Sequence, residues 1–172
     1  MSPPNYIPSR VDRQDVSAGG RVLILVAAHH GQREGRQHNT PNVQAVEVIV
    51  QIEQHRLSVI GVYRSPSATI EVNQILLEML TEQAESSDRT LLVGDFNAPE
   101  IDLSTETAPL GTFGERLLEM LHRRALIQHV TGEIRWRFRQ TASTLDLVCT
   151  KFPNEVRGTV VEDPLGKATT EL

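Results

Sequence analysis

Residues 91–99 (LLVGDFNAP) place a carboxylate and a carboxamide directly after a short apolar run. An apolar run bounded by turn residues predicts a buried strand, and Gly94 allows the backbone to turn sharply where that strand ends. Asp95 and Asn97 are two residues apart, so in an extended chain they would point to the same side. There they could bind a hard cation or a phosphate oxygen. The same residue types also favour an ordinary tight turn, and this stretch alone leaves both interpretations open.

The composition is that of a single soluble globular domain. The chain has 172 residues, of which 39% are hydrophobic and 23% are charged, typical of one domain with a sizeable core. The longest apolar run, residues 22–28, is too short for a membrane span, and the first residues lack the pattern of a secretory signal. The lone Cys149 excludes an internal disulfide and a cysteine-rich zinc site. We therefore expect an intracellular protein, nuclear or cytoplasmic, with no membrane and no disulfide partner.

The net charge of −5 conceals an uneven distribution. Residues 71–106 hold nine acidic residues and one basic residue, Arg89. Residues 116–139 hold six arginines and two glutamates. Because nucleic-acid binding needs a local basic surface, this second region is a candidate for phosphate contact. Arginines that solvate a helix face and a hairpin explain the pattern equally well.

Apolar runs and periodicity predict a mixed α/β chain. Residues 1–18 are polar and rich in proline and serine, so we expect no stable structure there, and residues 29–42 read as a polar loop. A 3.6-residue apolar stripe predicts a helix over residues 68–85, capped around Ser67, and a second helix is expected from Phe113. Such an order suggests packed sheets with helices outside. The expected strands cover residues 21–26, 45–52, 57–63, 90–93, 125–130, 133–139, 145–150 and 155–161.

Three sequence motifs occur in a fixed order along the chain. They are GVYRSP at residues 61–66, VGDFN at residues 93–97 and STLDLV at residues 143–148, and a Gly-Gly pair at residues 19–20 precedes them. Together they resemble the endonuclease/exonuclease/phosphatase superfamily, and more narrowly the endonuclease domain of non-LTR retrotransposons. The resemblance covers residues 19–167, which leaves a flexible segment at 1–18 and a tail at 168–172. It implies an α/β fold, a four-layer sandwich of two mixed β-sheets flanked by helices, here incomplete.

The resemblance also implies roles for individual residues. Tyr63 matches the tyrosine beside the scissile phosphate, and Asp95 matches the aspartate that aligns or deprotonates the attacking water. Asn97 matches the asparagine that hydrogen-bonds the phosphate. Asp146 matches the aspartate that orients the catalytic histidine or helps to bind the metal. A phosphodiester is anionic, so this chemistry needs a cation, hydrogen-bond donors and a base for water.

Further expectations from the same resemblance concern ligands and partners. Ser143 and Arg64 are expected to bind substrate, and Asp95 to bind Mg²⁺, which prefers carboxylate and water oxygens. The implied substrate is DNA, contacted through its phosphate backbone. The parent polypeptide is expected to carry a reverse transcriptase.

Two parts of the family's site do not occur at the expected places. The family's metal-binding glutamate lies upstream of the Gly-Gly pair, where residues 1–18 contain no glutamate, and its final Ser-Asp-His motif is replaced by residues 168–170, Ala-Thr-Thr. We therefore expect a fragment truncated at both ends whose metal-dependent endonuclease activity is lost or weak. The alternative is a non-catalytic remnant, or a nucleic-acid-binding fragment of a retrotransposon protein. A phosphatase or deadenylase of the same superfamily fits the motifs less well.

Overall fold

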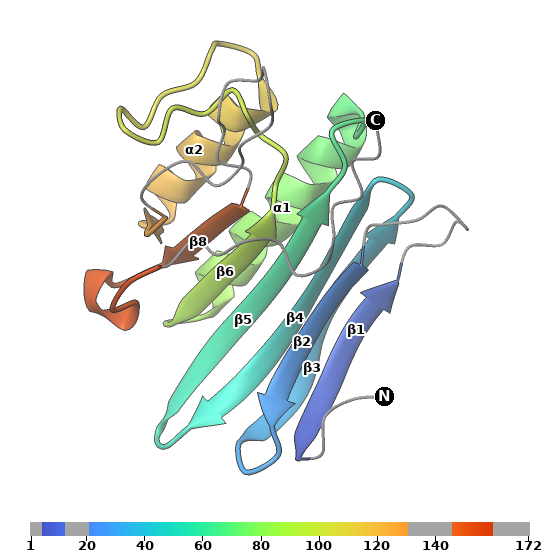
Figure 1. Ribbon diagram of the computed structural model, residues 1–172, viewed down its shortest axis with the longest axis vertical. Coiled ribbons are helices and arrows are strands. Elements are labelled where there is room, and N and C mark those ends of the chain that lie inside the picture. The colour runs from blue at the N-terminus through green and yellow to red at the C-terminus, as the bar shows by residue number, and fades with distance from the viewer. Residues whose placement is uncertain (1–4, 13–20, 131–145, 160–172) are drawn as a thin grey trace, which may run out of the picture.

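The computed structural model describes residues 5–12, 21–130 and 146–159. These residues form a two-stranded sheet, a six-stranded sheet and two α-helices (Figure 1). The elements in chain order are β1 (Tyr6–Asp12), β2 (Arg21–Ala27), β3 (Gly31–Thr40), β4 (Val43–Ile52), β5 (His55–Arg64), α1 (Ile70–Ser86), β6 (Thr90–Asp95), α2 (Phe113–Arg123), β7 (Ile127–Gln128), β8 (Asp146–Thr150) and a 3₁₀ turn at Pro153–Glu155.

The two sheets pack face to face, and the helices cover the outer face of the larger one (Figure 1). The larger sheet has the strand order β3-β4-β5-β6-β8-β7, and the smaller pairs β1 with β2. The smaller sheet lies against β3, β4 and β5. The expected mixed α/β sandwich is therefore confirmed. Within the described residues it has three layers, because both helices lie on the same side.

The centre of the larger sheet arises from a hairpin followed by a crossover. β4 and β5 pair antiparallel over their full length, and β5 then pairs parallel with β6. Parallel neighbours cannot be joined by a tight turn, and α1 supplies the crossover connection. This topology brings the ends of β5 and β6 to the same edge of the sheet.

Both helices begin at a threonine that caps them. The Thr69 hydroxyl accepts a hydrogen bond from the Val72 amide, and the Thr112 hydroxyl accepts one from the Glu115 amide. Each satisfies one of the amides that a helix start leaves without a partner. The first helix was expected to be capped around Ser67, and the observed cap lies two residues later.

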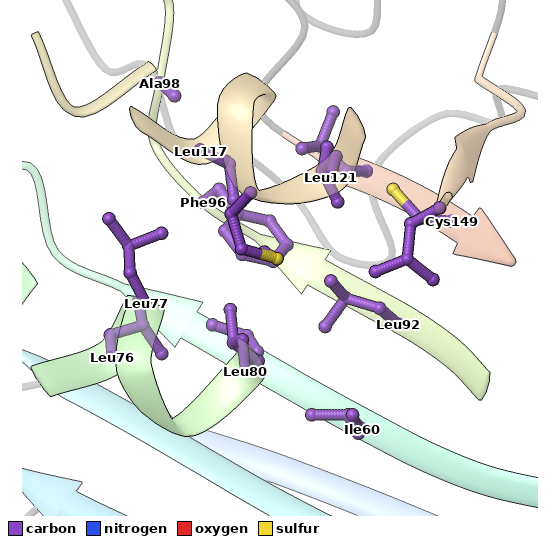
Figure 2. Packing of buried hydrophobic residues seen from close by; sticks show 14 of the residues in the cluster. Ile60, Leu76, Leu77, Leu80, Leu92, Phe96, Ala98, Leu117, Leu121 and Cys149 are labelled. Atoms are coloured by element: carbon purple, nitrogen blue, oxygen red, sulfur yellow. The ribbon is translucent and has the colours of Figure 1, made fainter. Parts of the chain in front are cut away.

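The main hydrophobic core lies between the helices and the larger sheet. Apolar side chains of α1 and α2 interdigitate with those of β5, β6 and β8 (Figure 2). Phe96, which directly follows β6, is fully buried in this cluster. The residues labelled in Figure 2 are Ile60, Leu76, Leu77, Leu80, Leu92, Phe96, Ala98, Leu117, Leu121 and Cys149.

Burial makes Cys149 chemically inert in the folded protein. The thiol lies in the main core, and desolvation raises its pKa to about 12. Since only the thiolate is nucleophilic, we expect negligible reaction with a thiol reagent at pH 8 in the native state and complete reaction in denaturant. The measurement is the rate of labelling with and without urea. Rapid labelling of the native protein would show that this core opens readily.

Two strands form where the sequence predicted none. Residues 1–18 were expected to lack structure, yet all seven residues of β1 pair with β2. Ser9 and Val11 are buried, and Val11 packs with Val22 of β2 and Val46 of β4. The expected polar loop at 29–42 contains β3, an edge strand with a bulge between Glu34 and Gln37. Edge strands tolerate polar residues because one side faces solvent, which hides them from hydrophobic patterns.

Two further expected strands are shortened or not formed. The strand expected at residues 125–130 is reduced to β7, and the described part of the strand expected at 155–161 is a 3₁₀ turn followed by irregular chain. The strand expected at residues 133–139 lies outside the described residues. Neither described helix is long and apolar enough to cross a membrane.

Candidate active site

Three of the predicted site residues form one row across adjacent strands. Tyr63 of β5 lies opposite Asp95 of β6, and Asp95 lies opposite Asp146 of β8. Residues directly opposite each other on neighbouring strands project their side chains from the same face. Residues far apart in the sequence therefore meet where β5 and β6 end and β8 begins.

This row faces away from the helices. Its neighbours along the strands, Val62 and Leu147, pack into the main core beneath α1 and α2. Since side chains alternate between faces, Tyr63, Asp95 and Asp146 point to the side on which β1 and β2 lie. All three are half-buried rather than enclosed.

The two carboxylates of the row are suitable for binding a divalent cation. Asp95 and Asp146 face each other directly, so two carboxylate groups lie side by side on one face of the sheet. Mg²⁺ characteristically uses one or two carboxylates and keeps several waters. Among residues 5–12, 21–130 and 146–159, no cluster of three or more His, Cys, Asp or Glu side chains forms a complete metal site.

Asn97 does not extend alongside Asp95 as expected. Its amide donates to Asp95 Oδ1 at 3.0 Å, and its φ of 44° places it in the left-handed region. Asparagine tolerates this conformation better than most residues. The chain therefore turns, and Asn97 Nδ2 donates to the carbonyl oxygen of Arg64 at 2.7 Å. The extended backbone expected through Asn97 is therefore wrong.

Arg64 lies inside the protein on the helix face of the sheet. Its side chain is 6% exposed, with Nε donating to Asn73 Oδ1 at 2.7 Å. Nη1 donates to the carbonyl oxygens of Phe96 at 3.1 Å and Asn97 at 3.0 Å. The guanidinium also stacks 3.9 Å above the ring of Phe113. Its contacts hold the turn after β6 rather than face the half-buried row.

Burial changes the electrostatics of this arginine. Desolvation lowers the pKa of Arg64, and the nearby charge of Glu100 partly opposes that shift. An arginine stays protonated even so, because its ordinary pKa is far above neutrality. The expected direct contact with substrate stays a prediction, and the geometry gives Arg64 a positioning role for Asn97.

The helix arginines of the basic region make local ion pairs. Arg123 pairs with Glu119, and Arg124 pairs with Glu85. Both lie at the end of α2, on the opposite side of the sheet from Asp95. Arg116 also lies on α2. Ser143 and the remaining three arginines of that region, Arg135, Arg137 and Arg139, lie outside the described residues.

Sequence reasoning missed the residues that hold Arg64. Asn73 is buried on the inner side of α1, and Phe113 begins α2. One signal was available: an asparagine within the apolar stripe of a helix must find a partner, because a buried amide without one is costly. Nothing in the sequence identifies that partner.

Comparison with solved structures shows which known proteins share this fold. The endonuclease domain of TRAS1, a telomere-specific non-LTR retrotransposon, matches with a TM-score of 0.63 and 15% identity, over 84% of this chain and 64% of that one. A mannosyl-6-phosphatase from Bacteroides thetaiotaomicron matches with a TM-score of 0.53 and 12% identity, over 86% of this chain and 63% of that one. At such identities the likeness shows a shared fold, and the chain spans less than two thirds of either structure.

The sequence itself identifies the family. The model of the endonuclease-reverse transcriptase family matches residues 57–166, which is more than half of the chain. No match is found among curated protein sequences. The chain belongs to the endonuclease-reverse transcriptase family, within the endonuclease/exonuclease/phosphatase fold, as its motifs predicted.

Proposed function

We propose that this chain is part of a retrotransposon-type endonuclease domain that nicks DNA by hydrolysing a phosphodiester. The observation that carries the proposal is the row of Tyr63, Asp95 and Asp146 on one half-buried face of the sheet. Membership of the endonuclease-reverse transcriptase family supports the same reaction class. The parent polypeptide would then carry a reverse transcriptase.

Each residue of the row has a distinct role in this proposal. Asp95 aligns the attacking water and accepts its proton, because a carboxylate at the sheet edge can reach both the water and a bound phosphate. The Tyr63 hydroxyl donates to a phosphate oxygen as negative charge develops. Asn97 hydrogen-bonds the phosphate from the turn, where its side chain is held by a bond to the Arg64 carbonyl oxygen.

Mg²⁺ is the cofactor that fits this donor set. Asp95 would hold it, and Asp146, which lies opposite, would help. When bound there, the ion would supply positive charge to neutralise the phosphate. Among the described residues no third His, Cys, Asp or Glu side chain joins these two carboxylates, so we expect a requirement for millimolar Mg²⁺.

A plasmid assay with matched variants tests the proposal. Asp95→Asn keeps an oxygen that can accept from the Asn97 amide but removes the charge and the base. We expect Mg²⁺-dependent relaxation of supercoiled plasmid to fall by roughly a hundredfold or more. Asp102→Asn is the control, since exposed Asp102 accepts similar local bonds from Ser104 and Thr105 in another loop. Equal relaxation by wild type and Asp95→Asn would reject the assignment.

A non-catalytic nucleic-acid-binding fragment is the second candidate. It is favoured by the lack of a three-ligand metal site among the described residues. Salt-dependent retention of DNA with no relaxation by the wild-type chain would support it.

A further inference from the structure

A pocket lies at the opposite end of the larger sheet from the candidate active site. The β4–β5 hairpin continues beyond the end of α1, which leaves the helix face of the sheet open there (Figure 1). The pocket has a volume of about 440 Å³. Arg56, in its wall, is seven residues from Tyr63 along β5, roughly 23 Å at the rise of an extended strand. The two sites are thus separate.

Three arginines from different elements line this pocket. They are Arg33 of β3, Arg56 of β5 and Arg89, which directly precedes β6. Arg33 lies opposite Ile49, and Arg56 lies opposite Gln51, two residues further along β4. Positions two apart share a face, so both side chains project from the helix face of the sheet. The pairing of β3 and β5 with β4 therefore brings Arg33 and Arg56 to the same face of the sheet.

Their charge is poorly neutralised. Across the part of the chain that the structure describes, neither Arg33 nor Arg56 has a carboxylate oxygen within ion-pair distance. The closest pairing of Arg89, from Nε to Glu155 Oε1, is long at 3.9 Å. By contrast Arg36, Arg123 and Arg124 each pair closely with a glutamate.

The two acidic groups of the wall, Glu47 and Asp88, offset the charge of the three arginines only in part. Asp88 in the wall is exposed. The buried carboxylate of Glu47 already accepts from Ser58 Oγ at 2.6 Å, the Arg36 amide at 3.1 Å and Gln83 Nε2 at 3.3 Å. At the negative end of α1, Lys151 Nζ donates to the Ser87 carbonyl. The available hydrogen-bonding capacity is therefore mostly that of guanidinium donors.

We propose that this pocket binds a phosphomonoester or diphosphate group. A guanidinium forms paired, charge-assisted hydrogen bonds to phosphate oxygens, and free arginines on two flanking strands can grip one such group from both sides. The ligand is either a small phosphorylated molecule or the 5′-terminal phosphate of a nucleic-acid strand. The concave shape and limited volume exclude a duplex.

Titration of the full chain with inorganic pyrophosphate tests this binding. We expect Arg33→Gln and Arg56→Gln each to weaken binding by roughly tenfold or more, because each loses a charge-assisted contact. Arg123→Gln, which alters an exposed arginine on α2, should leave the affinity unchanged. All the altered side chains are well exposed, and matching thermal unfolding curves check that each variant is folded. No binding by the wild type, or equal losses in Arg123→Gln, overturns the proposal.

Competition distinguishes the two sources of the phosphate. Single-stranded oligonucleotides with and without a 5′-phosphate are added to the pyrophosphate complex. Displacement only by the phosphorylated strand assigns the pocket to a strand terminus, and displacement by neither assigns it to a small molecule. Equal displacement by both would mean that backbone phosphates bind, which contradicts the proposed chemistry.

Discussion

Replacing Gly94 by alanine should destabilise the fold by roughly 3 kcal/mol or more and displace Asp95. A Cβ at this position would lie 1.9 Å from the Val62 carbonyl oxygen, and the φ of Gly94 is +146°. The contact is with backbone of the neighbouring strand, which cannot rotate away as a side chain can. Relief requires β5 and β6 to separate where Tyr63 and Asp95 face each other.

Substitutions at two other glycines separate the steric clash of the new Cβ from the strain of a positive φ. Gly111 has a φ of +79° but open space around its missing Cβ, so Gly111→Ala measures backbone strain alone, about 1 kcal/mol. Gly158 has open space and no positive φ, so Gly158→Ala should be nearly neutral. Urea denaturation of the three variants gives the free energies of unfolding. If Gly94→Ala costs no more than Gly111→Ala, the strands are not locked together at this edge.

The sequence predicts those parts of the fold that bury apolar strands. The β4–β5 hairpin and β6 follow from aliphatic runs, and the motifs correctly brought Tyr63, Asp95 and Asp146 to one edge. Edge strands escape such prediction. β3 is polar over most of its length and is held by pairing with β4 rather than by burial.

The error about Asn97 is local. An extended chain was assumed beyond Asp95. Instead, the Asp95 carboxylate accepts a hydrogen bond from the Asn97 amide, and the chain turns there. Aspartate side chains often accept a hydrogen bond from the amide two residues later. Of the two interpretations of this stretch, the tight turn therefore predicted the backbone better than the extended chain. The turn and the candidate site are thus the same structure, not alternatives.

The position of Arg64 could be predicted only in part from the alternation of side chains along β5. Adjacent strand residues face opposite sides, so the side chains of Tyr63 and Arg64 leave β5 on opposite faces of the sheet. The sequence does not tell which face the helices cover. Only the packed structure reveals that Arg64 meets Asn73 and Phe113.

Loss of the Arg64 guanidinium should therefore cost stability as well as site geometry. Arg64→Met keeps much of the apolar stem but leaves Asn73 Oδ1 and the carbonyl oxygens of Phe96 and Asn97 without their donor. Buried polar atoms that lose a partner cost about 1–3 kcal/mol each, although relaxation and water will lessen the sum. We expect a loss of about 3 kcal/mol in the free energy of unfolding, measured by urea denaturation. Arg64→Lys should fall between, since an ammonium lacks the planar fork that spans three acceptors.

Arg123→Met provides the matched control for this substitution. That arginine is exposed and makes an i,i+4 pair with Glu119, so its loss should cost about 0.5 kcal/mol or less. Amide hydrogen exchange at Asn97 separates positioning from general destabilisation, because the turn should lose protection under conditions where β4 keeps it. If Arg64→Met matches Arg123→Met in stability and leaves Asn97 protected, then Asn97 is held by the Asp95 turn alone, and Arg64 has no part in placing it.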